Sequence, residues 1–189
     1  MTMTHPATTP STPSTDAGAD AHGERADLLQ TLAHHREFLR LTTRDLTDEQ
    51  AGRRTTVSEL CLGGLIKHVA SVERSWVDFI LEGPEVMGDW NNMTEEDLAR
   101  RADEFRMLPG ETLTGVLENY AEVARRTEEV VGMLPDLSVS RPLPPAPWYK
   151  PGTQWSMRRV LLHIIAETAQ HAGHADIIRE SLDGARSMG

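Results

Sequence analysis

The most informative stretch of this chain lies near its C-terminus and reads WSMRRVLLHIIAETAQHAGHADIIRE over residues 155–180. Its apolar residues follow helical spacing, and Ser156 is a suitable N-cap for a helix that ends before Asp183-Gly184. Four side chains with metal-binding atoms stand at i, i+4, i+8 and i+11: His163, Glu167, His171 and His174. At about 100° per residue, these four lie within roughly 80° of one another around the helix. One helix face therefore offers three imidazoles and a carboxylate, which are side chains that bind Zn²⁺ and related metals.

Two interpretations of this cluster follow from the residues alone. A face exposed to solvent would need no metal, but Val160, Ile164 and Ile178 lie on or beside the same stripe. Burying three imidazoles and a carboxylate among such residues without a cation would leave polar groups unpaired. We therefore interpret the face as a candidate metal site, with a solvated polar face as the alternative.

A complete site needs a donor from a second segment, and His68 is the best candidate. It lies in the middle of a stretch whose apolar residues repeat at helical spacing over residues 62–81. The alternative for His68 is a core histidine bonded to a backbone carbonyl. His34 and His35 are weaker candidates, because adjacent residues cannot face the same way on a helix.

Helical spacing of apolar residues recurs along the chain and predicts an all-α fold. The long predicted helices cover residues 26–46, 62–81, 111–134 and 156–182. Thr94, three residues before Asp97, resembles a capping box and predicts a short extra helix to about residue 105 in the second connection. We find no stretch whose alternation of apolar and polar residues demands a strand. The pattern therefore predicts a four-helix bundle.

The last connection, residues 135–155, contains six prolines together with Trp148 and Trp155. This composition predicts a rigid Pro-rich crossover loop, and loops of this length often carry function. Arg158 follows in the first turn of the last helix, where the helix dipole disfavours positive charge and a partner carboxylate is expected. Trp148, Trp155 and Arg158 are therefore candidates for substrate contact, with a structural role as the alternative for each.

Composition and charge narrow the class of protein. Residues 1–23 are rich in Thr, Pro, Ser, Ala and Asp, which predicts a disordered tail before a single domain over 24–189. The net charge of −10 disfavours nucleic-acid binding. No apolar run reaches the roughly 18 residues of a membrane span, and the N-terminus lacks the pattern of a secretory signal. The single cysteine excludes an internal disulfide, so we expect a cytoplasmic protein.

The pairing of GGLIKHVASVE at 63–73 with HIIAETAQHAGHADIIRE at 163–180 resembles the DinB/YfiT-like superfamily of four-helix-bundle metalloproteins. The resemblance covers about residues 25–184 and is nearest to an actinobacterial branch of that superfamily. It implies an up-down-down-up bundle with one metal near one end. It also implies that one ligand comes from the second helix and two, four residues apart, from the fourth. The corresponding residues here are His68, Glu167 and His171.

His163 and His174 are additional imidazoles that the family pattern does not use as ligands. The resemblance leaves them as residues beside the metal and as candidate catalytic proton carriers. His174 stands three residues after His171, so His174 in place of Glu167 as a ligand stays an alternative.

The resemblance also implies an activity. A Glu-then-His pair resembles the mycothiol-dependent maleylpyruvate isomerase, whereas the bacillithiol transferases carry two histidines. The expected cofactor is a divalent metal, Zn²⁺ first and Ni²⁺ or Mn²⁺ as alternatives, with a low-molecular-weight thiol such as mycothiol as co-substrate. The expected enzyme is a thiol-dependent S-transferase or isomerase acting on a small electrophile. The alternatives are a metal-dependent hydrolase and a non-catalytic metal-binding stress-response bundle, and we consider a homodimer as the assembly.

Overall fold

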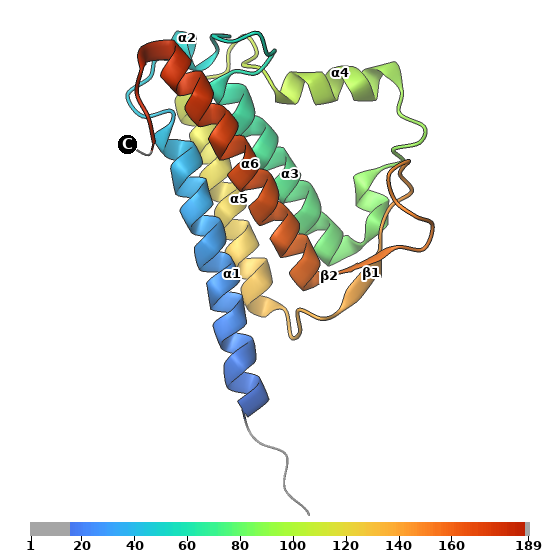
Figure 1. The fold of residues 1–189 in the computed structure, drawn as a ribbon. Helices are drawn as coiled ribbons and strands as arrows, with labels where there is room; N and C mark the ends of the chain where they lie inside the picture. Colours follow the sequence, from blue (N-terminus) through green and yellow to red (C-terminus); the bar gives the residue numbers. More distant parts are fainter. Residues whose placement is uncertain (1–15, 188–189) are drawn as a thin grey trace, which may run out of the picture.

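Four long helices form the body of the protein in a computed structural model that describes residues 16–187 (Figure 1). They are α1 (Asp16–Leu41), α3 (Leu62–Glu82), α5 (Leu113–Met133) and α6 (Met157–Asp183). Helix α6 packs against α1 and α3, and α3 also packs against α5. Helices α1 and α6 run in one direction and α3 and α5 in the other, which is the up-down-down-up order (Figure 1). The predicted all-α four-helix bundle is confirmed.

The shorter elements lie in the connections between these helices. They are α2 (Asp48–Ala51), the 3₁₀ helix η1 (Pro84–Met87), α4 (Glu95–Glu104), β1 (Ser140–Pro142) and β2 (Gln154–Ser156). Helix α4 lies beside the bundle and contacts α3 (Figure 1). No helix within residues 16–187 is both long enough and apolar enough to cross a membrane.

Local capping signals locate several helix ends as the sequence predicts. The Ser156 hydroxyl accepts a hydrogen bond from the Arg159 amide at 3.2 Å, and α6 ends at Gly184 in the left-handed conformation, with φ of 80°. Thr94 and Asp97 form a reciprocal capping box at the start of α4. These bonds satisfy amide groups that a helix cannot bond internally, so they favour one start for each helix.

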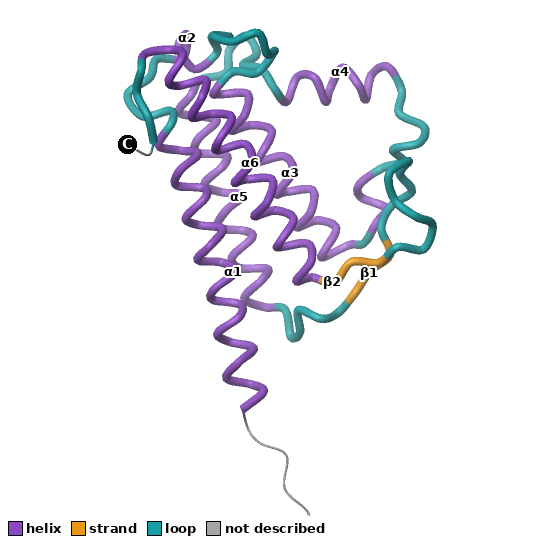
Figure 2. The backbone as a smooth tube through the Cα atoms, viewed as in Figure 1, coloured by secondary structure: helices purple, strands orange, loops and turns teal. Residues whose placement is uncertain are grey.

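The crossover loop contains a short antiparallel hairpin that the sequence does not reveal. Strands β1 and β2 pair Arg141 with Trp155, at the end of the bundle where α3 ends and α6 begins (Figure 2). Each strand has three residues, and β1 includes Pro142, so neither is long enough to show an alternating pattern. The hairpin anchors both ends of the loop and holds Trp148 between them.

Helix α1 starts earlier than the predicted domain boundary at residue 24. It begins at Asp16, so residues 16–23 of the predicted tail are helical. The alternating alanines Ala17, Ala19 and Ala21 favour a helix in that segment. Residues 1–15 of the predicted tail lie outside the described residues.

The bundle interior contains a buried charged network as well as apolar side chains. Arg36 of α1 donates to Glu73 of α3, with 3.2 Å from Nε to Oε2, and the Thr127 hydroxyl of α5 also donates to Glu73. Arg36 is 5% exposed and Glu73 is fully buried. This network links three of the four long helices and separates two apolar clusters of the core.

Candidate metal centre

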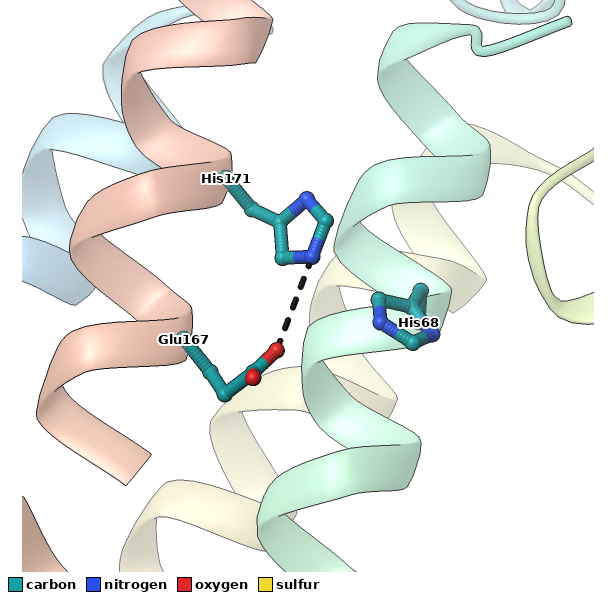
Figure 3. A group of neighbouring side chains, drawn as sticks. All are labelled: His68, Glu167 and His171. Atoms are coloured by element: carbon teal, nitrogen blue, oxygen red, sulfur yellow. Dashed lines mark ion pairs between the residues drawn. The ribbon is translucent and has the colours of Figure 1, made fainter. Parts of the chain in front are cut away.

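The three residues that the resemblance implies as ligands lie together between α3 and α6. One donor atom from each of His68, Glu167 and His171 lies within 4.8 Å of the others (Figure 3). The Nε2 atom of His171 lies 3.7 Å from Oε2 of Glu167. His68 is 3% exposed and His171 is 9% exposed, so both imidazoles are held by the surrounding protein.

The segment after α4 supports His68 from the opposite side. The Nδ1 atom of His68 lies 3.3 Å from Oε2 of Glu104, and the Phe105 ring stacks on the imidazole with centroids 4.0 Å apart. Ser71 donates to the other oxygen of Glu104 at 2.9 Å. An Nδ1–H that donates to Glu104 leaves the lone pair of Nε2 free for a metal, a common arrangement around metal-binding histidines.

Gly64 allows this segment to approach α3. A Cβ atom at Gly64 would lie 2.0 Å from the backbone oxygen of Phe105, closer than any side chain tolerates. The glycine therefore permits the contact that brings Glu104 and Phe105 to His68. The sequence analysis did not identify Glu104, because its contact with His68 depends on how α4 packs against α3.

The two additional histidines of α6 lie on opposite sides of the ligand pair. The Nδ1 atoms of His174 and His171 lie 3.4 Å apart, within reach of one hydrogen bond. With His171 as the donor, its Nε2 lone pair stays free on the Glu167 side. His163 Nε2 lies 3.8 Å from Oε1 of Glu167, and the His163 ring makes T-shaped contacts with both Trp76 and Trp155. The structure therefore groups all four α6 residues, while the compact three-donor set excludes His174.

These donors fit a divalent cation. Two imidazoles and one carboxylate make up the protein ligands of many catalytic zinc sites, which keep a further coordination position open. Burial, followed by the charges of His68 and His174, lowers the pKa of His171 to about 4. Burial also lowers the pKa of His163. Burial raises the pKa of Glu104, but hydrogen bonds from His68 and Ser71 outweigh it and the net shift is downward. Neutral imidazoles beside ionised carboxylates are the protonation states that metal binding requires.

The depressed pKa of His171 predicts how the stability of the metal-free protein depends on pH. In the unfolded chain His171 has its ordinary pKa of 6.5. Between pH 6.5 and 4, His171 is therefore protonated in the unfolded state and neutral in the folded state. The free energy of unfolding is therefore not reduced by His171 above pH 6.5, and it falls as the pH drops from 6.5 toward 4. This shift in pKa corresponds to a loss of about 3 kcal/mol in the free energy of unfolding over that pH range.

Urea denaturation of chelator-treated protein at pH 7, 5.5 and 4.5 measures this effect. The free energy of unfolding should fall more steeply for the wild type than for His171→Gln, whose side chain does not titrate in this range. Equal slopes for the two proteins would contradict the assigned pKa.

A cavity of about 640 Å³ opens beside the candidate centre. His68, His163 and Glu167 line its inner end, and Trp148 lines it from the crossover loop. Trp155 lies behind this surface and stacks on Trp76 with centroids 4.9 Å apart. Of the three residues predicted to contact substrate, Trp148 lines the cavity. Trp155 and Arg158 are not among the residues that line it.

Arg158 already has the carboxylate partner that its place in the first turn of α6 predicts. Its guanidinium makes two hydrogen bonds to Glu24 of α1, one of them 2.8 Å from Nη2 to Oε2. The structure does not place it on the cavity. The contact joins α1 to the start of α6.

Comparisons with known proteins agree with this architecture. A crystal structure of a conserved protein from Enterococcus faecalis is similar to this chain, with a TM-score of 0.60 and 14% sequence identity. The similarity covers 84% of this chain and 96% of the other, and at this identity it supports the fold alone. No curated protein matches the sequence. The sequence profile of the mycothiol-S-transferase family matches residues 27–184, which include the whole candidate metal centre. The chain therefore belongs to the mycothiol-S-transferase family, whose members are thiol S-transferase enzymes.

Proposed function

We propose that this enzyme joins mycothiol to a small electrophile at a Zn²⁺ centre held by His68, Glu167 and His171. The observation that carries the proposal is the convergence of these three donors within 4.8 Å, beside a cavity, in a chain of this family. Zinc is the first candidate because two imidazoles and a carboxylate suit it, and Ni²⁺ and Mn²⁺ are the alternatives. When bound, the cation supplies Lewis acidity that favours the thiolate form of a thiol at neutral pH.

Side chains around the centre can accept the thiol proton and orient the ligands during S-transfer. A new bond forms between sulfur and the electrophilic carbon, the leaving group departs with its bonding electron pair, and the thiol proton must be removed. Burial lowers the pKa of His163, which lines the cavity in its neutral form, and the Glu167 carboxylate 3.8 Å away would favour the imidazolium formed when it accepts that proton. His174 lies behind His171 and holds the imidazole in one orientation.

A direct assay tests the proposed reaction. Zinc-loaded protein is mixed with mycothiol and an alkyl halide, and the thioether and halide are quantified by mass spectrometry and ion chromatography. We expect one thioether and one halide for each electrophile consumed, at a rate above that of free mycothiol, and we expect His163→Ala to slow the step. Matched reactions with glutathione test the choice of thiol.

The other functions considered from the sequence give different results in the same assay. A metal-dependent hydrolase would consume the electrophile without thiol and yield an alcohol. A non-catalytic metal-binding protein would leave the background rate unchanged for every thiol offered. Either result would contradict the proposed function.

A further inference from the structure

All four tryptophans of the chain gather on one side of the candidate metal centre. Their rings form a continuous series: Trp155 stacks on Trp76, Tyr149 lies 5.7 Å from Trp155 and 5.9 Å from Trp148, and Trp148 lies 5.5 Å from Trp90. Four of these rings line the cavity directly: Trp76, Trp90, Trp148 and Tyr149. We call these four residues the aromatic wall. Trp148 remains 60% exposed despite these contacts, which is a high exposure for so large an apolar side chain.

The charged side chains that line the cavity are all engaged with a protein partner except one. Asp97 caps α4 and pairs with Arg100, and Asp89 accepts hydrogen bonds from the Asn91 amide and the Asn92 side chain. Glu104 and Glu167 contact the histidines of the centre.

The exception is Arg101. It has no carboxylate within ion-pair distance among the side chains that the structure describes, and its guanidinium lies 4.8 Å above the Trp90 ring. Stacking on an aromatic face leaves the N–H groups at the edge of a guanidinium free to bind a carboxylate in bidentate geometry. Arg101 therefore supplies a positive charge without a carboxylate partner beside Trp90, the last ring of the series.

Arg101 is close enough to the centre to act on the same ligand. It stands one helical turn before Glu104, about 5–6 Å along the helix surface, and Glu104 lies 3.3 Å from His68. Arg101, His68 and Glu167 line the same cavity, so one ligand in it can contact both ends.

We propose that this cavity selects a flat, apolar electrophile that carries a carboxylate. The aromatic wall would hold the flat body by stacking, and Arg101 would bind the carboxylate at the end away from the metal. This proposal rests on the proposed function in one respect, which is that the bound carboxylate-bearing ligand is the electrophile that mycothiol attacks. The binding site itself follows from the wall and from the unpaired guanidinium.

Isothermal titration at neutral pH can test the selection without any reaction. The probes are trans-cinnamate and cinnamamide, which share a flat shape and differ in charge, and the protein is the zinc-loaded full chain without thiol. We expect cinnamate to bind about tenfold more tightly than cinnamamide, as for one charge-assisted contact. Arg101→Gln should remove this preference and leave the Kd of cinnamamide unchanged. Trp148→Leu should weaken both probes by about threefold or more.

Arg100→Gln is the matched control, because Arg100 is the neighbouring arginine and already pairs with Asp97. It should keep the tenfold preference. The preference should also persist in His171→Ala, which lacks a ligand of the centre. Equal Kd values for the two probes in the wild type would overturn the proposal. A preference that survives in Arg101→Gln but disappears in His171→Ala would also overturn it, since the carboxylate would then bind the metal.

The two proposals fail in distinguishable ways. Absence of thioether formation with an intact Arg101-dependent preference would contradict the transfer reaction alone. Thioether formation without any preference for the carboxylate would contradict the selection alone.

Discussion

Replacing His171 with alanine should reduce bound zinc from one ion per chain to none and slow mycothiol transfer at least a hundredfold. His171 supplies one of only two imidazoles in the three-donor set, and two remaining donors hold Zn²⁺ poorly. Lewis-acid stabilisation of a developing anion is worth several kcal/mol, which sets the scale of the loss, about 10²-fold or more. Metal content is measured after dialysis by atomic emission, and the rate by thioether formation. Thermal unfolding then checks that the variant is still folded.

Two other histidines provide controls for this result. His34→Ala changes an exposed side chain of α1 and should leave zinc and rate unchanged. His174→Ala should keep one zinc per chain, because His174 contacts His171 rather than joining the three donors. Loss of zinc from His174→Ala would contradict the three-ligand set and favour His174 as a ligand in place of Glu167.

Glu104→Gln should give an intermediate effect. It keeps the size of the side chain but weakens the charge-assisted hydrogen bond to His68. Loss of such an outer contact typically lowers metal affinity about 10- to 100-fold. Competition with a chromophoric chelator measures the affinity, while stoichiometry at saturating zinc should stay at one. A stoichiometry of zero would mean that Glu104 binds the metal directly.

Replacing Glu73 with alanine should lower the free energy of unfolding by about 3–5 kcal/mol. The variant leaves the Arg36 guanidinium, only 5% exposed, without its main carboxylate in the centre of the bundle. It also removes the acceptor of the Thr127 hydroxyl. Urea denaturation followed by circular dichroism measures the change.

A matched exposed pair separates this effect from a general loss of charge. Glu129 pairs with Arg125 on the surface of α5, so Glu129→Ala should leave the urea midpoint essentially unchanged. The double variant Arg36→Met/Glu73→Leu should recover most of the stability lost in Glu73→Ala, because it removes both buried charges together. A double variant less stable than Glu73→Ala would mean that packing, rather than an unpaired charge, causes the loss.

Three of the long helices were predictable together with their ends, whereas the helix predicted over residues 26–46 begins at Asp16 and ends at Leu41, where three threonines follow within the next six residues. Apolar spacing located α3, α5 and α6 to within two residues at most of their termini, and Ser156 and Thr94 act as the expected caps. The grouping of His163, Glu167, His171 and His174 followed from helix geometry in the same way. The hairpin within 140–156 was not predictable, because strands of three residues carry no periodic signal.

The remaining features of the site depend on contacts between segments far apart in the chain. His68 was a candidate from its sequence context, but its distance from Glu167 depends on how α3 packs against α6. Glu104 reaches His68 only because Gly64 lets the segment after α4 approach α3. Arg158 was a candidate for substrate contact and instead binds Glu24, which is 134 residues away.

Short-range periodicity and capping are therefore sufficient to define α3, α4, α5 and α6 and the face of α6 that carries the candidate metal donors. They are encoded within a few turns of chain, where each side chain's direction follows from its position. Which of those donors meet, what orients them and which aromatic rings line the cavity depend on long-range packing. That packing brings α4 and the crossover loop to the side of the bundle on which His68 and Glu167 lie, and residues of both segments line the cavity there.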